Sequence, residues 1–166
     1  MTMKPLAAAL PLLLSGCLFS PNSAAWSGVM DALDPRSKKV LQMCAGYCEG
    51  DLAAATRYLA DDAIVHVNDR DLSVADATAG YAASHAAFAD VRHENVTCTT
   101  MLYNNGQVFT NYWYVWHGTA RSSGEQVAVK GYAWFRWDGD HIVESYCSFD
   151  PTRYDAVLAA HEAAAK

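Results

Sequence analysis

The sequence predicts one α+β domain, in which three helices precede a long antiparallel sheet and a fourth helix follows it. Three observations lead to this prediction. Between residues 34 and 89, segments whose inward-facing residues recur at helical spacing each follow an Asp or Ser that can cap a helix. Strand-like segments separated by tight turns fill residues 95–149, and a second Asp-Pro pair at Asp150 opens the last helix. A chain of 166 residues is long enough for one domain with a substantial core.

The first helix is predicted to begin at Asp34 and Pro35. An Asp side chain caps free backbone amides, and Pro fits the first helical position. Gly50 is predicted to end this helix. Between these limits, residues of one face follow at helical spacing: Val40, Met43, Cys44 and Tyr47.

A compact corner follows the first helix. Asp51 is predicted to cap a short second helix, in which Leu52, Ala55 and Leu59 share a face. Residues 64–68 are predicted to form a strand and residues 69–72 a loop.

The third helix is predicted over residues 74–89. Ser73 and Asp76 resemble a capping box at its start. Tyr81, His85 and Phe88 share one stripe of this helix, which favours a packing role for them.

The rest of the domain is predicted to be an antiparallel sheet. Asn105-Gly106 and Asp138-Gly139 are tight-turn sequences. Together with a polar loop at residues 118–125, they divide the segment into four strands, at 95–103, 107–117, 127–137 and 140–149. Residues 159–166 are an Ala-rich tail.

Composition limits the partners. The formal net charge is −6 and no Lys/Arg cluster is present, which excludes nucleic acid as the expected partner. The sequence contains no ligand set with metal-site spacing and no Gly-rich phosphate loop, so no metal or cofactor is expected. A small apolar or aromatic molecule is the expected partner.

The N-terminus predicts export. An apolar run from Pro5 to Leu14 ends in Leu14-Ser15-Gly16-Cys17, which looks like a bacterial lipobox with Cys17 as the lipidated residue. Residues 1–17 are therefore expected to be a lipoprotein signal peptide and residues 18–33 a tether. A lipid on Cys17 would hold the protein in the bacterial cell envelope. Two alternatives stay open: cleavage after Ala25, or a true start at Met30 in a cytoplasmic protein.

Four further cysteines are Cys44, Cys48, Cys98 and Cys147. Cys44 and Cys48 lie one helical turn apart, a poor geometry for a mutual disulfide. We expect small buried thiols in the core.

Two motifs carry a family resemblance. The corner from Gly50-Asp51-Leu52 to Asp61-Asp62-Ala63 and the hairpin at residues 135–144 resemble the nuclear transport factor 2-like superfamily, specifically its SnoaL-like domains. The resemblance covers about Val40 to Tyr154. It implies a cone-shaped, strongly bent antiparallel sheet over residues 34–158, with the three helices on one face and a ligand cavity inside.

The same resemblance argues against the best-known chemistry of the fold. Ketosteroid isomerases use an Asp base together with a Tyr and a protonated Asp. The corresponding positions here are Met43, Val67 and Ala133, none of which exchanges a proton. The chain is therefore not expected to be a ketosteroid isomerase.

The last hairpin sets the expected ligand face. If Asp138-Gly139 is a two-residue turn, Ala133 lies opposite Glu144, and Glu144, Tyr146 and Asp150 point into the cone with Ala133. A turn one residue longer reverses this assignment. The expected ligand-binding set is Met43, Tyr47, Val67, Tyr112, Ala133, Phe135, Glu144 and Tyr146.

Asp150 and His93 are the candidate catalytic residues. SnoaL-like cyclases use an Asp late in the sheet as acid/base, and His93 precedes a strand expected at the cone rim. Asp150 can instead simply cap the last helix, and His93 can be a surface histidine. Two functions stay open: ligand binding with acid–base catalysis of the cyclase, isomerase or dehydratase type, or a non-catalytic, envelope-tethered binding module.

Aromatic residues crowd two of the expected strands. Alternation sends half of them to each face of the sheet. The inward set suits an apolar ligand, the outward set suits a homodimer interface on the outer face, and a plain aromatic core is the alternative. These residues are Tyr112, Trp113, Tyr114, Trp116, Tyr132, Trp134 and Trp137.

Overall fold

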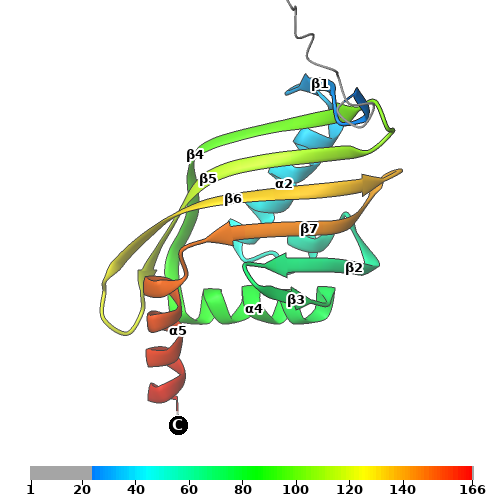
Figure 1. Ribbon diagram of the computed structural model, residues 1–166. Helices are drawn as coiled ribbons and strands as arrows, with labels where there is room; N and C mark the ends of the chain where they lie inside the picture. Colours follow the sequence, from blue (N-terminus) through cyan, green and yellow to red (C-terminus); the bar gives the residue numbers. More distant parts are fainter. Residues whose placement is uncertain (1–23, 166) are drawn as a thin grey trace, which may run out of the picture.

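The computed structural model describes residues 24–165. The predicted three helices before the sheet and one after it are confirmed (Figure 1). Among the described residues, no helix is long and apolar enough to cross a membrane. The helices are α2 (Pro35–Glu49), α3 (Leu52–Thr56), α4 (Val74–Ala87) and α5 (Thr152–Ala164).

The strands form one bent seven-stranded sheet in the order β1-β4-β5-β6-β7-β2-β3. Neighbouring strands are antiparallel except β2 and β7, which run parallel. In Figure 1, α2 and α3 lie behind the strands and α5 descends from the end of β7. The strands are β1 (Gly28–Asp31), β2 (Leu59–Val67), β3 (Arg70–Leu72), β4 (Phe88–Tyr103), β5 (Val108–Ala120), β6 (Gln126–Asp138) and β7 (His141–Phe149).

The predicted helix boundaries have the expected caps. The Asp34 carboxylate accepts from the backbone N–H of Arg36 at 2.8 Å. Gly50 adopts a φ of 76°, a left-handed conformation that glycine reaches without steric cost. Asp51 and Ser73 cap α3 and α4 through their side-chain oxygens. The corner that carries the family resemblance therefore folds as local capping chemistry requires.

Several strands are longer than the sequence predicts. β2 begins at Leu59, and β3 replaces the expected loop by pairing Val65 with Leu72. β4 begins directly after α4, so that His93 lies inside a strand. Strand pairing extends these segments beyond what their own residues indicate, because neighbouring strands satisfy their backbone groups.

The chain ends also differ from expectation. Residues 28–31, expected to belong to a tether, form β1 and pair with β4. Helix α5 continues to Ala164 through most of the expected Ala-rich tail. The expected signal peptide, with its lipidation site Cys17, lies outside the described residues. The alternatives of cleavage after Ala25 and of a start at Met30 stay predictions.

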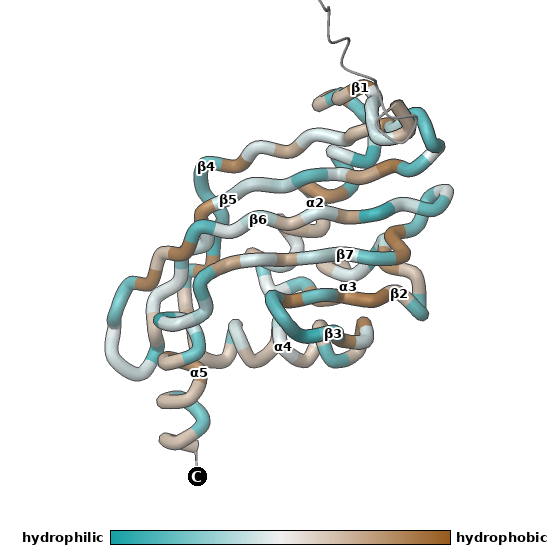
Figure 2. Tube along the Cα trace, in the orientation of Figure 1, coloured by the Kyte–Doolittle hydropathy of each residue, from teal (hydrophilic) through white to brown (hydrophobic). Residues whose placement is uncertain are grey.

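The two faces of the sheet have different surroundings. Alternate residues of β5 and β6 pack against the helices and form two buried clusters, one around Phe88 and Trp116 and the other around Met43 and Trp137. Figure 2 shows hydrophobic and hydrophilic residues changing places repeatedly along the strands. The helix-facing side of the sheet therefore encloses the interior of the domain.

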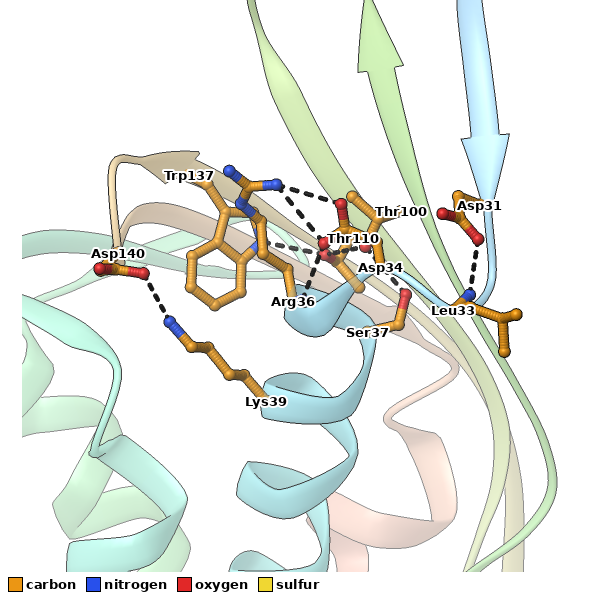
Figure 3. Close-up of polar contacts among 10 residues, drawn as sticks. All are labelled: Asp31, Leu33, Asp34, Arg36, Ser37, Lys39, Thr100, Thr110, Trp137 and Asp140. Atoms are coloured by element: carbon orange, nitrogen blue, oxygen red, sulfur yellow. Dashed lines mark hydrogen bonds and ion pairs between the residues drawn. The ribbon is translucent and has the colours of Figure 1, made fainter.

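A chain of buried hydroxyl groups fixes α2 on the sheet (Figure 3). Ser37 Oγ lies 2.9 Å from Thr100 Oγ1, which lies 2.8 Å from Thr110 Oγ1. Trp137 donates its indole N–H to the same Thr110 oxygen at 2.9 Å. Ser37, Thr100 and Thr110 are at most 1% exposed, so water does not compete for these bonds.

Replacing Thr110 with Val should destabilise the fold by about 1–3 kcal/mol, because the buried Trp137 N–H loses its partner and the Thr100 hydroxyl keeps only its bond to Ser37. Urea denaturation measures the change. Thr119→Val on the same strand is the matched control, since the outward-facing Thr119 makes no side-chain hydrogen bond among the described residues. Equal stability losses in the two variants would contradict this account.

Candidate ligand cavity

A cavity of about 710 Å³ lies between the helix-facing side of the sheet and the helices. Met43 and Tyr47 from α2, Tyr81 from α4, and Tyr154 from α5 contribute to its walls. Ala133 on β6 lies at its floor. The volume is typical of a site for a small organic molecule.

The charged groups of the cavity lie only at its exposed edge. Asp69 and Arg70 follow β2, and Asp155 and Glu162 lie on α5, and all four residues are exposed. Among the other described lining residues, the ionisable groups are one histidine, tyrosines and cysteines. An ionised ligand group buried among them would have no opposite charge, so the interior favours an uncharged ligand.

Tyr47 connects three walls of the cavity. Its hydroxyl accepts a hydrogen bond from the Trp116 indole N–H at 3.0 Å and lies 3.0 Å from Ser84 Oγ. Ser84 is fully buried on α4. Burial raises the pKa of Tyr47 above its ordinary range, so the hydroxyl keeps its proton. These bonds fix the Tyr47 ring between α2, α4 and β5.

His93 is the histidine that lines the cavity. Its Nδ1 lies 2.9 Å from Tyr112 Oη, and its ring lies 4.3 Å from that of Tyr114. Burial lowers the pKa of His93 to about 4, because the charged imidazolium loses its hydration. The imidazole is therefore neutral at physiological pH.

The cysteines near His93 also remain protonated. Cys44 and Cys147 both line the cavity, and Cys147 Sγ lies 3.1 Å from Tyr114 Oη. Burial raises the pKa of both thiols, so neither is a reactive thiolate. The four cysteines that the structure describes are free, but they are half-buried rather than fully buried as expected, and Cys48 does not belong to either core cluster.

Eight of the residues selected from the sequence line this cavity. The resemblance placed three of them, Met43, Val67 and Ala133, at the catalytic positions of ketosteroid isomerases, and here they form an apolar wall. The other five are Tyr47, His93, Tyr112, Phe135 and Tyr146.

The predicted register of the last hairpin is wrong. Asp138 pairs with His141, and a β-bulge then places Arg136 opposite Glu144 and Ala133 opposite Cys147. The bulge adds one residue to β7, and one extra residue sends all later side chains to the other face.

Glu144 is accordingly misplaced by the sequence analysis, whereas Tyr146 does line the cavity, with its ring on the outer face. Glu144 faces away from the cavity, and it accepts hydrogen bonds from Arg136 Nε at 2.7 Å and His66 Nε2 at 3.1 Å. Tyr146 borders the cavity, but its ring stacks on Trp134 at 5.9 Å on the outer face.

Asp150 lies at the start of α5, outside the cavity lining. Its side chain is exposed and accepts from both the backbone N–H and the hydroxyl of Thr152, at 3.0 and 2.6 Å. These bonds lower the pKa of Asp150. The contacts match the capping alternative, and the location does not suit a group that acts on a ligand inside the cavity.

The sequence analysis missed several residues of the lining. Ser145 and Cys147 were missed because the bulge reversed the faces of β7. Tyr114 and Trp116 share the alternation of Tyr112, a signal that was available in the sequence. Two further aromatic residues that it missed are Tyr81, which was assigned to packing, and Tyr154.

The outward aromatic residues form a ladder on the other face of the sheet. Trp113 is 40% exposed and its ring lies 5.3 Å from that of Tyr132. Trp134 contacts both Phe109 and Tyr146. Alternation therefore divides the aromatics between cavity and outer face, and the expected homodimer through the outer face stays a prediction.

Within residues 24–165, no three His, Cys, Asp or Glu side chains are arranged to hold a metal ion. The cavity walls therefore supply hydroxyl, thiol and imidazole groups to a ligand.

The comparisons with known proteins identify the family. The SnoaL-like domain matches residues 40–145, which include the corner, most of the sheet and His93. The chain belongs to the SnoaL-like domain family. The resemblance expected from the corner and the last hairpin is thereby confirmed. A search of curated proteins found no match for this SnoaL-like chain.

Solved structures share the fold of this SnoaL-like protein at low identity. A proposed polyketide cyclase from Xanthomonas campestris pv. campestris is 17% identical, with a TM-score of 0.60 over 75% of this chain and 97% of that one. AclR, a proposed hydroxylase from Streptomyces galilaeus, is 17% identical, with a TM-score of 0.59 over 76% and 96%. IdmH, a proposed polyketide cyclase from Streptomyces antibioticus, is 18% identical, with a TM-score of 0.54 over 74% and 97%. Because these proteins carry different proposed activities, the shared fold does not assign one.

The lowered pKa of His93 predicts a specific pH dependence of stability. Between pH 6.5 and about 4, the unfolded chain binds a proton that folded His93 excludes. The free energy of unfolding should therefore decrease as the pH is lowered from 6.5 to about 4, and this residue should account for about 3 kcal/mol of the decrease. His93→Phe should lose that part of the dependence in urea denaturation at pH 4–7.

His141→Phe is the control for this measurement, because His141 is exposed at the start of β7. It should keep the pH dependence of the unchanged protein. The assignment of His93 is wrong if His93→Phe keeps it too.

Proposed function

We propose that this SnoaL-like domain binds a small, uncharged and largely apolar molecule in its cavity. One observation carries the proposal: a cavity of about 710 Å³ whose charged side chains lie only at the exposed edge. Aromatic rings and methyl groups supply apolar contact area, which favours a flat ligand. Hydroxyl groups and one neutral imidazole supply polar contacts without requiring a charged ligand.

Acid–base catalysis of the cyclase type is the second candidate function. His93 favours it, because its Nε2 has no partner among the described residues and its ring lines the cavity. The proposed polyketide cyclases among the structural neighbours support the same idea. In a turnover assay with a cyclisable polyketide, His93→Phe should abolish activity, and turnover that persists in this variant would exclude His93 as the catalytic group.

The binding proposal is tested with Nile red, a neutral aromatic dye whose fluorescence rises in apolar surroundings. The unchanged protein should bind the dye with saturable fluorescence. Ala83 on α4 lines the cavity and is also exposed to solvent. A Trp side chain at this position can therefore fill part of the cavity without displacing core residues. We expect this variant to weaken dye binding by roughly 10-fold or more, since about 1.4 kcal/mol of lost apolar burial suffices.

The neighbouring Ala82 provides a matched control. It is exposed on the same helix but does not line the cavity. Ala82→Trp should therefore leave the dissociation constant of the dye unchanged. Absence of dye binding to the unchanged protein, or equal weakening by both variants, would contradict binding in this cavity.

A further inference from the structure

A second pocket lies on the outer face of the sheet. Its volume is about 220 Å³, and it shares no lining residue with the cavity. This is below the roughly 300–1,000 Å³ of sites for drug-sized molecules, so the pocket admits one small group. Phe109, Asn111, Tyr132 and Trp134 alternate with the cavity-facing residues of β5 and β6, so their side chains point away from the cavity. The lining of this outer pocket is Trp26, Tyr103, Phe109, Asn111, Tyr132 and Trp134.

Aromatic rings meet at steep angles around the outer pocket. The Tyr103 ring meets that of Trp26 at 76° and that of Phe109 at 84°, with centroids 5.2 and 5.8 Å apart. The Phe109 ring in turn meets that of Trp134 at 69°. Rings at these angles form a recess rather than a flat platform. A recess of this kind suits a compact apolar ring that enters between the aromatic side chains.

Hydrogen bonds hold Trp26 at the edge of the outer pocket. The side-chain amide of Asn104 donates to the carbonyl oxygen of Ala24 at 3.0 Å. The backbone N–H of Asn105 donates to the carbonyl of Ala25 at 3.1 Å. Both bonds tie the segment before β1 to the turn between β4 and β5. The pocket is therefore formed before a ligand arrives, which reduces the entropy lost on binding.

The polar groups of the outer pocket are neutral, and several of them are unused donors. Tyr132 donates its hydroxyl to Asn111 Oδ1 at 2.7 Å, which occupies that acceptor. The side-chain NH₂ of Asn111 has no partner among the described residues. The indole N–H groups of Trp26 and Trp134 have none there either. A ligand that brings acceptors but no donors matches this set.

We infer that the outer pocket binds a proline-rich segment of another protein in the polyproline II conformation. A proline side chain is a compact apolar ring, the backbone carbonyls of such a segment accept hydrogen bonds, and proline has no N–H that needs an acceptor. Segments of this kind dock in aromatic-lined grooves, and their preformed helix loses little entropy on binding.

Charged ligands fit the outer pocket less well. No acidic or basic side chain is among its described lining residues, so an ion would find no opposite charge there. The site is separate from the cavity, and the inference does not depend on the function proposed for the cavity.

Octaproline is the probe, and isothermal titration calorimetry of the full chain measures its dissociation constant. We expect saturable binding of octaproline. An octapeptide of alternating glycine and serine has the same number of peptide units without the rings, and it should not bind. Trp26→Ala should weaken octaproline binding by roughly 10-fold or more, because buried Trp side chains are among the largest contributors to binding at interfaces.

Asn111→Asp tests the donor separately. The carboxylate keeps the shape of the side chain and an acceptor for Tyr132, but it replaces the NH₂ group with a second oxygen. This variant should weaken octaproline binding by roughly 3- to 10-fold. Ile64→Ala is the control, because Ile64 is exposed opposite Glu144 on the same face of the sheet and does not line the pocket. It should leave the dissociation constant unchanged.

Several results would overturn the inference. They are absence of saturable octaproline binding, equal weakening by Trp26→Ala and Ile64→Ala, and tighter binding in Asn111→Asp. Saturable binding of tetramethylammonium in place of octaproline would identify a cation site instead. Octaproline should also leave bound Nile red in the cavity, and displacement of the dye would place the peptide there rather than in the outer pocket.

Discussion

The hydrogen bonds of the Tyr47 hydroxyl are the constraint on which the rest of the cavity depends. Trp116 donates to this oxygen from β5, and Ser84 bonds it from α4. The backbone carbonyl of the same residue accepts from His85 Nε2 at 2.6 Å, which adds a second tie between α2 and α4. One residue on α2 thus fixes the separation between the helices and the sheet, and with it the space that remains open.

The open space is chemically uniform in one respect: its inner groups are uncharged. Burial raises the pKa of the tyrosines and cysteines and lowers that of His93, so both kinds of group become neutral for the same reason. A preorganised set of neutral donors discriminates by hydrogen bonding rather than by charge. Such a site is useful for binding and also for polarising a bound carbonyl group, so one architecture is compatible with both candidate functions.

The sequence analysis correctly predicted the features that depend on residues close together in the chain, such as helix caps and the corner after the first helix. The caps at Asp34, Asp51 and Ser73 and the left-handed Gly50 fixed the helices, and the spacing of the corner located Met43 and Val67 in the cavity wall. It failed at the last hairpin, where a bulge depends on pairing between β6 and β7 and sends Glu144 to the outer face. It also missed Tyr81, because helical spacing shows that a side chain faces inward but not whether its hydroxyl finds a partner there.

The protonation of His93 tests the central claim most directly. Long-range ¹H–¹⁵N NMR correlation spectra distinguish a neutral imidazole from a charged one and locate its proton, and the His93→Phe variant assigns the signals. Burial lowers the pKa of His93 to about 4, and a phenol is a better donor than an imidazole, so at pH 7 the account predicts a neutral ring whose Nδ1 accepts from the Tyr112 hydroxyl and whose proton resides on Nε2. A charged ring, or a proton on Nδ1 with a bare Nε2, would contradict it.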